Sequence, residues 1–168
     1  MLRKMPNKKD ILGVFIFLMT MVAFGQHDKE GTMGHREVSE PGFEAVLSGL
    51  FIRNTEEGIT DYATELHLTY WTTHKWAFGL GYTMIFEEES RIGHELAGLI
   101  SHKPYTFLTV NIGPSFSLPN THKDTEVSGY IETEWAFHIG AFHMGPTLGA
   151  LIGNDFRYFG GLHISYEF

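Results

Sequence analysis

Residues 162–168 read LHISYEF, a stretch in which apolar and polar side chains alternate and Phe168 comes last. Alternation with a period of two gives a β-strand one apolar face and one polar face. A strand of a lipid-embedded barrel has the same two faces, one toward the acyl chains and one toward the lumen. The stretch therefore predicts a membrane-spanning β-barrel.

The amino-terminal end of the chain predicts export. Residues 1–9 carry four Lys or Arg side chains, Ile11–Phe24 is an apolar run, and residues 23–25 (AFG) resemble a small-residue cleavage site. This pattern indicates a signal peptide over residues 1–25, because the run is shorter than the roughly 20 residues of a membrane-spanning helix. An uncleaved anchor is the alternative interpretation. The chain has no Cys, which excludes a lipidated amino terminus and a disulfide framework.

Charge and length limit the partners and the architecture. Beyond residue 25 the chain has eight Lys and Arg against 19 Asp and Glu, a net charge near −11 with His neutral. Nucleic acid is therefore not an expected partner. The polar segment 26–42 predicts a flexible periplasmic tail, whose His27, Asp28 and His35 could hold a cation loosely. The remainder, residues 43–168, is long enough for one domain.

Eight runs of alternating residues follow the tail, an even number as single-chain bacterial barrels require. The runs are residues 43–53, 60–72, 75–87, 91–102, 105–117, 126–138, 141–153 and 156–168. Short inner turns are expected at Thr73-His74, His102-Lys103-Pro104 and Ile139-Gly140. Longer, polar outer connections are expected at 54–59, 88–90, 118–125 and 154–155. The fold class is thus all-β, an eight-stranded antiparallel up-and-down transmembrane barrel.

The third run gives the clearest prediction of which face meets lipid. Its residues Trp76, Phe78, Leu80, Tyr82, Met84 and Phe86 share one face, and Ala77, Gly79, Gly81 and Thr83 share the other. Aromatic residues recur near the ends of the runs, as in the interfacial girdles of membrane barrels. A water-soluble antiparallel barrel or sandwich alternates equally well and is the alternative.

With these runs the chain resembles the small outer-membrane barrel proteins of the OmpA-domain and OmpX size class. The resemblance covers about residues 43–168 and rests on the architecture and on Phe168 preceded by Tyr166, Ile164 and Leu162. It implies a place in the outer membrane, with lipid and lipopolysaccharide around the barrel. It also implies that Phe168 and its neighbours are read by the barrel-assembly machinery.

Two Gly-Pro pairs depart from a regular barrel strand. They are Gly113-Pro114 and Gly145-Pro146, inside the fifth and seventh runs. Proline has no N–H for the ladder, and a closed barrel has no free edge to accept it. A bulge or a local break is expected at each pair.

Any chemistry is expected in the lumen, where carboxylates outnumber cations. The predicted inward set is Glu44, Asp61, Glu65, His67, Glu95, Asn111, Glu132, Glu134, His138, His143, Arg157, His163 and Glu167. Side chains nearly fill the lumen of an eight-stranded barrel, so these groups need partners. The partners left for the carboxylates are imidazoles, trapped water, shared protons or a bound cation.

Four of these residues are candidate ligands for a divalent metal. His138 and His143 flank the expected Ile139-Gly140 turn, His163 belongs to the next strand, and Glu134 lies one inward step from His138. Imidazoles beside a carboxylate suit zinc, copper or nickel. The alternatives are a structural network that locks the lumen and a titrating gate.

The leading functional interpretation is a structural or interaction barrel with no open pore, since eight strands leave little room for solutes. A cation-binding or cation-transporting barrel is the second. A lipid-modifying enzyme is the third, because His163-x-Ser165 is similar to the His-x-Ser pair of outer-membrane lipid A deacylases. Here the pair is expected to point inward, away from lipid, so no catalytic residue is assigned.

Overall fold

The computed structural model describes residues 41–87, 91–119, 125–139 and 142–168. The predicted signal peptide (1–25) and nearly all of the predicted tail (26–42) lie outside these residues. The regular elements of the described ranges are β1 (Gly42–Asn54), β2 (Thr60–Trp71), β3 (Trp76–Phe86), β4 (Ile92–Tyr105), β5 (Leu108–Ser117), β6 (Val127–Trp135), β7 (Phe137–Ile139), β8 (Phe142–Ile152) and β9 (Phe156–Glu167). Among the described residues we find no helix that is long and apolar enough to span a membrane.

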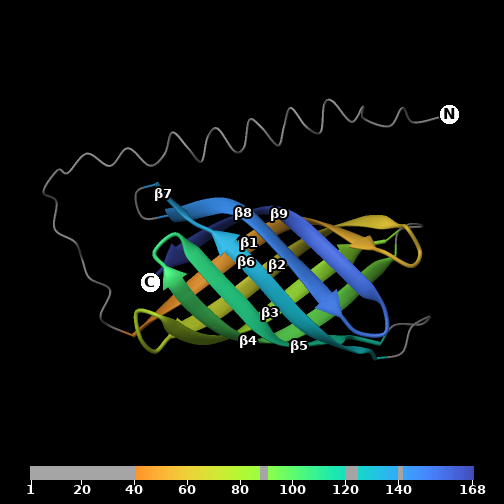
Figure 1. Cartoon of the computed structure of the whole chain (residues 1–168), viewed down its shortest axis with the longest axis horizontal. Helices are drawn as coiled ribbons and strands as arrows, with labels where there is room; N and C mark the ends of the chain where they lie inside the picture. Colours follow the sequence, from red (N-terminus) through yellow and green to blue (C-terminus); the bar gives the residue numbers. More distant parts are fainter. Residues whose placement is uncertain (1–40, 88–90, 120–124, 140–141) are drawn as a thin grey trace, which may run out of the picture. The chain divides into compact units, whose positions relative to one another are not determined.

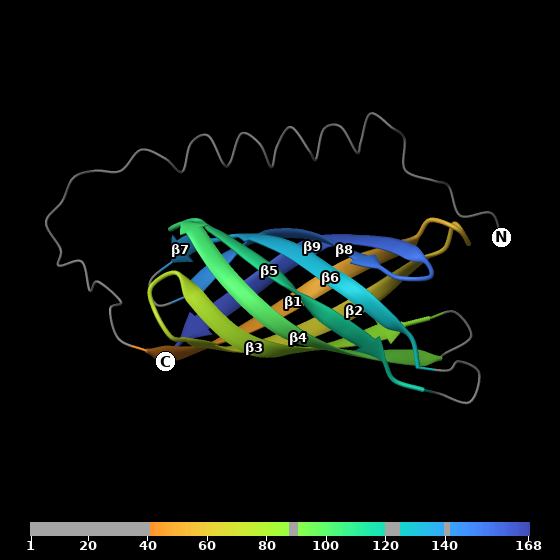
Figure 2. The ribbon, with the colours of Figure 1, turned by 60° about the horizontal axis from the view of Figure 1, so that its bottom comes forward.

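The strands close into one antiparallel barrel, as Figures 1 and 2 show. From β1 to β6 each strand pairs with the next one in sequence, β8 pairs with β9, and β9 pairs with β1. Both β6 and β7 pair with β8, in one continuous register that runs from Glu134↔Thr147 to Phe137↔Met144. They therefore occupy one position around the wall, and the predicted eight-stranded barrel is confirmed. The end that holds Gly42 and Phe168 is called the termini end below, and the other the loop end.

The predicted inner turn at His102-Lys103-Pro104 is wrong. Strand β4 continues to Tyr105, and the turn lies at Thr106 and Phe107. Pro104 sits where the register between β4 and β5 shifts, between His102 and Tyr105. The irregularity accommodates a residue that has no N–H. Lys103 is consequently a strand residue.

The other connections agree with the prediction within a residue or two. The first inner turn spans 72–75, and the outer connections include 55–59 and 153–155. The predicted outer connection 88–90, part of 118–125, and Gly140 of the last inner turn lie outside the described residues.

Both Gly-Pro pairs interrupt the ladder locally, as predicted, without shifting its register. The β4–β5 ladder skips Gly113 and Pro114 and resumes in the same register on either side. Pro146 lies opposite the break between β6 and β7, which divides the predicted sixth run at Ala136. In each pair the glycine comes so near a carbonyl of the preceding strand that a Cβ would overlap it. A local break in the hydrogen-bond ladder therefore accommodates each proline, which has no N–H to donate.

The two faces of the wall follow the predicted phase. On β3, Leu80 is 70% exposed while Ala77 is fully buried. The same division holds along the other strands, which expose large apolar side chains such as Phe51, Leu66, Ile112, Val127, Leu148 and Leu162. Such a continuous apolar surface far exceeds the patches of water-soluble monomers. It fits contact with lipid and argues against the soluble alternative.

Close backbone packing between β1 and β9 makes one glycine sensitive to substitution. A Cβ at Gly161 would overlap the carbonyl oxygen of Gly49, whereas a Cβ at Gly98 would lie 3.9 Å from its nearest neighbour, in Pro114. We expect Gly161→Ala to lower the free energy of unfolding by about 1–3 kcal/mol, and the control Gly98→Ala to leave it nearly unchanged. Urea titration of both variants refolded into lipid vesicles checks this. Equal stability of the two variants would contradict the close approach.

Candidate functional site

The lumen holds the predicted polar residues. The fully or nearly buried members are Glu44, Glu65, His67, Glu95, Asn111, Glu132, Glu134 and His163. Asp61, His143, Arg157 and Glu167 are partly buried, whereas His138, at the termini end, is exposed. The inward phase of the strands was thus correctly predicted, and His138 is exposed because β7 lies at the rim of the barrel.

An apolar cluster that was not predicted from the sequence lies in the lumen toward the loop end. It consists of Leu50, Ile52, Ala63, Ile85, Ala97, Leu99, Tyr130, Leu151 and Phe159. Leu50 and Ile52 share the inward phase of Glu44 along β1, so the alternation itself contained this signal. At the edge of this cluster, the guanidinium of Arg157 donates to Glu95.

A polar cluster lies next to it, which we call the central cluster: Glu65, His67, Glu132 and Glu134. The imidazole of His67, from β2, has its Nε2 3.3 Å from Glu65 and its Nδ1 3.6 Å from Glu132 and 3.4 Å from Glu134. One imidazole thus lies among three carboxylates from β2 and β6. The contacts cross the lumen.

Hydroxyl and amide donors complete the central cluster. Thr83 donates to Glu65 at 2.8 Å, Thr147 donates to Glu132 at 2.6 Å, and the Tyr130 hydroxyl lies 3.2 Å from Glu65. The Asn111 amide donates to Glu132 at 2.9 Å and to Glu134 at 2.8 Å. Buried carboxylates need donors of this kind. The cluster is therefore internally satisfied and well fixed.

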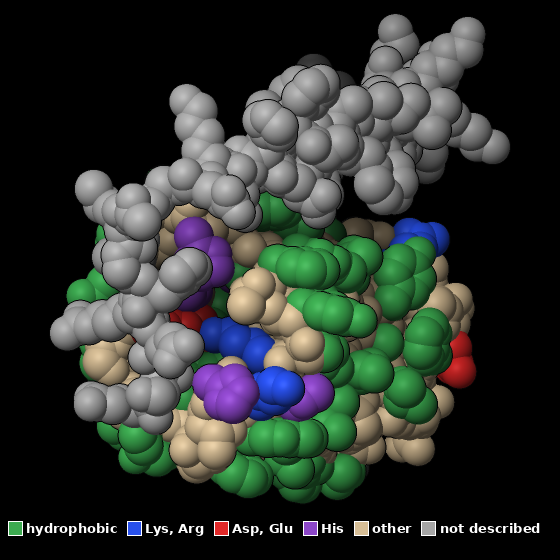
Figure 3. Space-filling view, turned by 60° about the vertical axis from the view of Figure 1, so that its left-hand side comes forward, with side chains coloured by type: hydrophobic (Ala, Val, Ile, Leu, Met, Phe, Trp, Pro, Cys, Tyr) green, Lys and Arg blue, Asp and Glu red, His purple; other side chains and the backbone are tan. Residues whose placement is uncertain are grey.

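A second polar group, the mouth cluster, lies at the termini end: Glu44 (β1), Lys103 (β4), His143 (β8) and Glu167 (β9). The Lys103 ammonium lies 2.9 Å from Glu167 and 3.9 Å from Glu44, and His143 Nδ1 lies 3.8 Å from Glu167 and 3.9 Å from Glu44. Figure 3 shows basic and histidine side chains gathered at this end of the barrel, within a border of hydrophobic ones.

Trp71 contacts two members of the mouth cluster. The Trp71 indole N–H donates to Glu44 at 2.7 Å, and the Lys103 ammonium lies 4.1 Å from the centre of the Trp71 ring. A cation over an indole face is attracted by the ring quadrupole. Lys103 therefore has three fixed neighbours, Glu44, Trp71 and Glu167.

The structure brings together only part of the predicted metal set. His138 and His143 face each other as expected, with ring centres 4.1 Å apart. His163 lies opposite Ser48 and Gly145, deeper in the lumen, and its Nδ1 has no hydrogen-bond partner among the described residues. Glu134 belongs to the central cluster. Among the residues that the structure describes, the groups of possible ligand atoms that lie close together are instead Glu44–His143–Glu167 and Glu65–His67–Glu132.

Glu44 and Glu167 were both predicted to point inward, but their proximity was not predicted. Their pairing follows from barrel closure, since they are register partners where β1 meets β9. An inward residue near the start of the first strand and one near the end of the last strand must approach each other in a closed barrel, and this was the available signal. The approach of Lys103 had no signal, because it was assigned to a turn.

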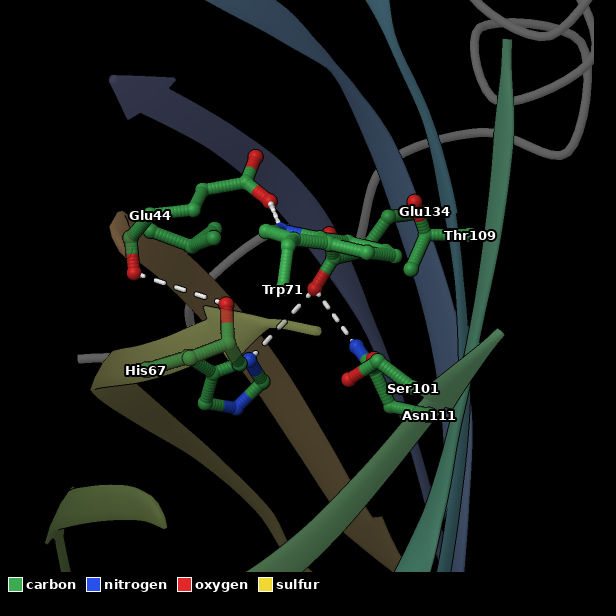
Figure 4. Close-up of a pocket in the computed structure, with 9 residues that line it drawn as sticks. Glu44, His67, Trp71, Ser101, Thr109, Asn111 and Glu134 are labelled. Atoms are coloured by element: carbon green, nitrogen blue, oxygen red, sulfur yellow. Dashed lines mark hydrogen bonds and ion pairs between the residues drawn. The ribbon is translucent and has the colours of Figure 1, made fainter. Parts of the chain in front are cut away.

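A small cavity of about 10 Å³ lies between the two clusters, and Figure 4 shows its lining. Glu44 and Trp71 line it from the mouth cluster side, and His67 and Glu134 from the central cluster. Such a volume accommodates about one water molecule. The two clusters are thus near neighbours with little room between them.

The His163-x-Ser165 pair points into the lumen, as its phase predicts. Both side chains are 3% exposed. The pair therefore does not form the lipid-facing site that a lipid-modifying hydrolase would need.

Comparison with solved structures gives several barrels of the same size. The N-terminal β-barrel domain of OprF from Pseudomonas aeruginosa superposes with a TM-score of 0.56 at 13% identity, covering 77% of this chain and 100% of that domain. A de novo designed transmembrane β-barrel gives 0.53 at 15% identity, covering 77% and 98%. The fold is that of a transmembrane β-barrel.

A third similar barrel is Neisserial surface protein A, with a TM-score of 0.52 at 9% identity over 76% of this chain and 97% of that one. No protein family profile matches the sequence, and no curated protein matches it. At these identities the likeness establishes the fold alone. The resemblance to the small barrel size class, stated from the sequence, is therefore confirmed at the level of architecture.

Proposed function

We propose that this protein is an integral outer-membrane barrel with a structural or interaction role and a lumen closed to solutes. The observation that carries the proposal is the continuous filling of the lumen by side chains. Leu50 in the apolar cluster and His67, Glu132 and Thr147 around the central cluster are each at most 1% exposed. An aqueous channel would leave luminal side chains accessible to water.

The outer face of the barrel supports the membrane part of the proposal. Exposed aromatic residues lie near strand ends, among them Phe43, Tyr70, Tyr105, Phe107 and Phe168 at the termini end and Phe51, Tyr62, Phe86, Phe156 and Tyr158 at the loop end. Two such belts flanking an apolar band match the interfacial girdles of membrane barrels. Membrane lipid, including lipopolysaccharide in its outer leaflet, is the partner that this surface would contact.

Conductance across planar lipid bilayers tests whether the lumen is closed. We expect the purified protein to insert without discrete conductance steps. The variant L50A/F159A, which shortens two luminal side chains of the apolar cluster, should also be silent, because the central cluster still fills the lumen and a cavity lined by apolar side chains stays dry. The variant L47A/F51A, which shortens two lipid-facing side chains of β1, should stay silent too. Regular steps from the unmodified protein would show an open pore.

A further inference from the structure

We propose that Glu44, His143 and Glu167 of the mouth cluster bind a divalent transition-metal ion of the zinc class. His138 supplies a fourth ligand, the second nitrogen, at the rim, and the ammonium of Lys103 competes with the metal for the two carboxylates. The proposal does not depend on the lumen being closed, since the site lies at the termini end of the barrel.

The distances between the possible ligand atoms suit a small cation. His143 Nδ1 lies 3.9 Å from Glu44 Oε1 and 3.8 Å from Glu167 Oε1. Ligands about 2.1 Å from a tetrahedral zinc ion are about 3.4 Å apart. The nitrogen therefore has to approach each carboxylate oxygen by roughly half an ångström. Side-chain rotation alone accomplishes such a movement.

The backbone holds these ligands on a rigid frame. Glu44 and Glu167 are register partners on β1 and β9, and His143 lies on β8, which pairs with β9. Three adjacent strands therefore present one ligand each. A frame of this kind places ligands more accurately than a loop does.

His138 extends the ligand set to four. It is the register partner of His143, and the centres of the two rings are 4.1 Å apart. Two imidazoles with two carboxylates are a donor set for zinc and its neighbours in the first transition series, and less so for magnesium or calcium, which prefer oxygen alone.

Lys103 is a second, independent indication that this place attracts cations. Its ammonium lies 2.9 Å from Glu167 and 3.9 Å from Glu44, over the ring of Trp71. The side chain delivers one positive charge to the point where two carboxylates meet. A divalent ion delivers two charges to the same oxygens, so binding requires Lys103 to swing aside.

The central cluster is a weaker metal candidate. Its Glu65, His67 and Glu132 also lie close together, but all three are buried, and Thr83, Asn111, Tyr130 and Thr147 already donate to the carboxylates. The mouth residues Lys103, His143 and Glu167 keep 13–28% of their side-chain surface exposed. An ion can therefore reach the mouth cluster from the solution.

Calorimetric titration of the protein with Zn²⁺ tests the proposal. The protein is purified with its tail and without a polyhistidine tag, and is kept in detergent micelles. We expect one strong site, weakened at least about tenfold by His143→Ala and by Glu167→Gln, since even losing an outer-shell partner costs 10–100-fold. Lys103→Met should bind Zn²⁺ more tightly, because it keeps the packing over Trp71 and removes the competing charge.

Two controls separate this site from other histidines. His74→Ala removes an exposed imidazole from the 72–75 turn and should bind as the unmodified protein does. H27A/H35A removes the tail histidines and should also retain the strong site. Absence of strong binding, binding that survives H143A and E167Q, binding lost only in H27A/H35A, or unchanged affinity in K103M would each overturn the proposal.

Trp71 gives an optical readout of the same event. Its indole N–H donates to Glu44 and its ring contacts Lys103, so a metal that binds Glu44 and displaces Lys103 changes both contacts. We expect Zn²⁺ to shift the tryptophan emission of the unmodified protein, with the same midpoint as in calorimetry, and to leave that of the Trp71→Phe variant unshifted. An equal shift in both proteins would contradict binding at the mouth cluster.

Discussion

His67→Ala will destabilise the barrel by about 3–5 kcal/mol, the cost of removing one partner from a buried ionic group. His67 lies within 3.3–3.6 Å of carboxylates of Glu65, Glu132 and Glu134. Removing the ring leaves these three buried acids facing one another without the imidazole that contacts all three. Urea unfolding in lipid vesicles measures the loss, and His74→Ala, on an exposed turn, should change stability by no more than about 0.5 kcal/mol.

A second substitution shows whether charge is the cause. Glu132→Gln removes one of the competing acids, so it should cost less in the His67→Ala background than in the unmodified protein. If the two losses simply add, the damage from His67→Ala comes from lost packing, and the electrostatic explanation fails.

Leu80→Arg will weaken the barrel by about 2–4 kcal/mol, the cost of an Arg at the bilayer midplane on the lipid face of a barrel. Leu80 lies in the middle of β3 and is 70% exposed. In water such an exposed side chain would tolerate Arg at almost no cost. The size of the effect therefore distinguishes lipid from solvent around β3.

The matched variant places the same charge near the interface. Ile92→Arg, at the first residue of β4, should cost only about 0–1 kcal/mol. Both variants are refolded into the same vesicles and unfolded with urea. Equal effects at Leu80 and Ile92 would mean that no membrane midplane lies near Leu80.

The period of two was sufficient to predict the strands and their faces. It placed Leu80 and Phe78 outward and Glu65, His67 and Glu132 inward, because a residue's face depends only on its position along its own strand. The two Gly-Pro pairs were predicted to break the ladder for an equally local reason, the missing N–H of proline.

Contacts across the lumen could not be predicted in this way. His67 on β2 meets Glu134 on β6, and Lys103 on β4 meets Glu167 on β9. Such pairs depend on the tilt and stagger of the closed barrel, which no single strand encodes. The contact of Lys103 with Glu167 was missed for a second reason as well. Lys103 was predicted to lie in the turn His102-Lys103-Pro104, and a turn residue was not expected to face the lumen.

The central claim is that the exposed apolar face of the barrel touches lipid while its polar face lines the lumen. The chain has no Cys, so a single cysteine at Phe78, Leu80, Tyr82 or Met84 on the outer face of β3, or at Lys75 in the exposed 72–75 turn, can carry the only spin label. In lipid vesicles, the four labels on β3 should be relaxed more by oxygen dissolved in the bilayer than by a water-soluble reagent, and the label at Lys75 should show the reverse. The unlabelled thiol of Thr83→Cys, on the buried inner face, should react with a water-soluble thiol reagent only after unfolding. Stronger relaxation by the water-soluble reagent at Leu80, or rapid reaction of the Thr83→Cys thiol in the folded barrel, would contradict the claim.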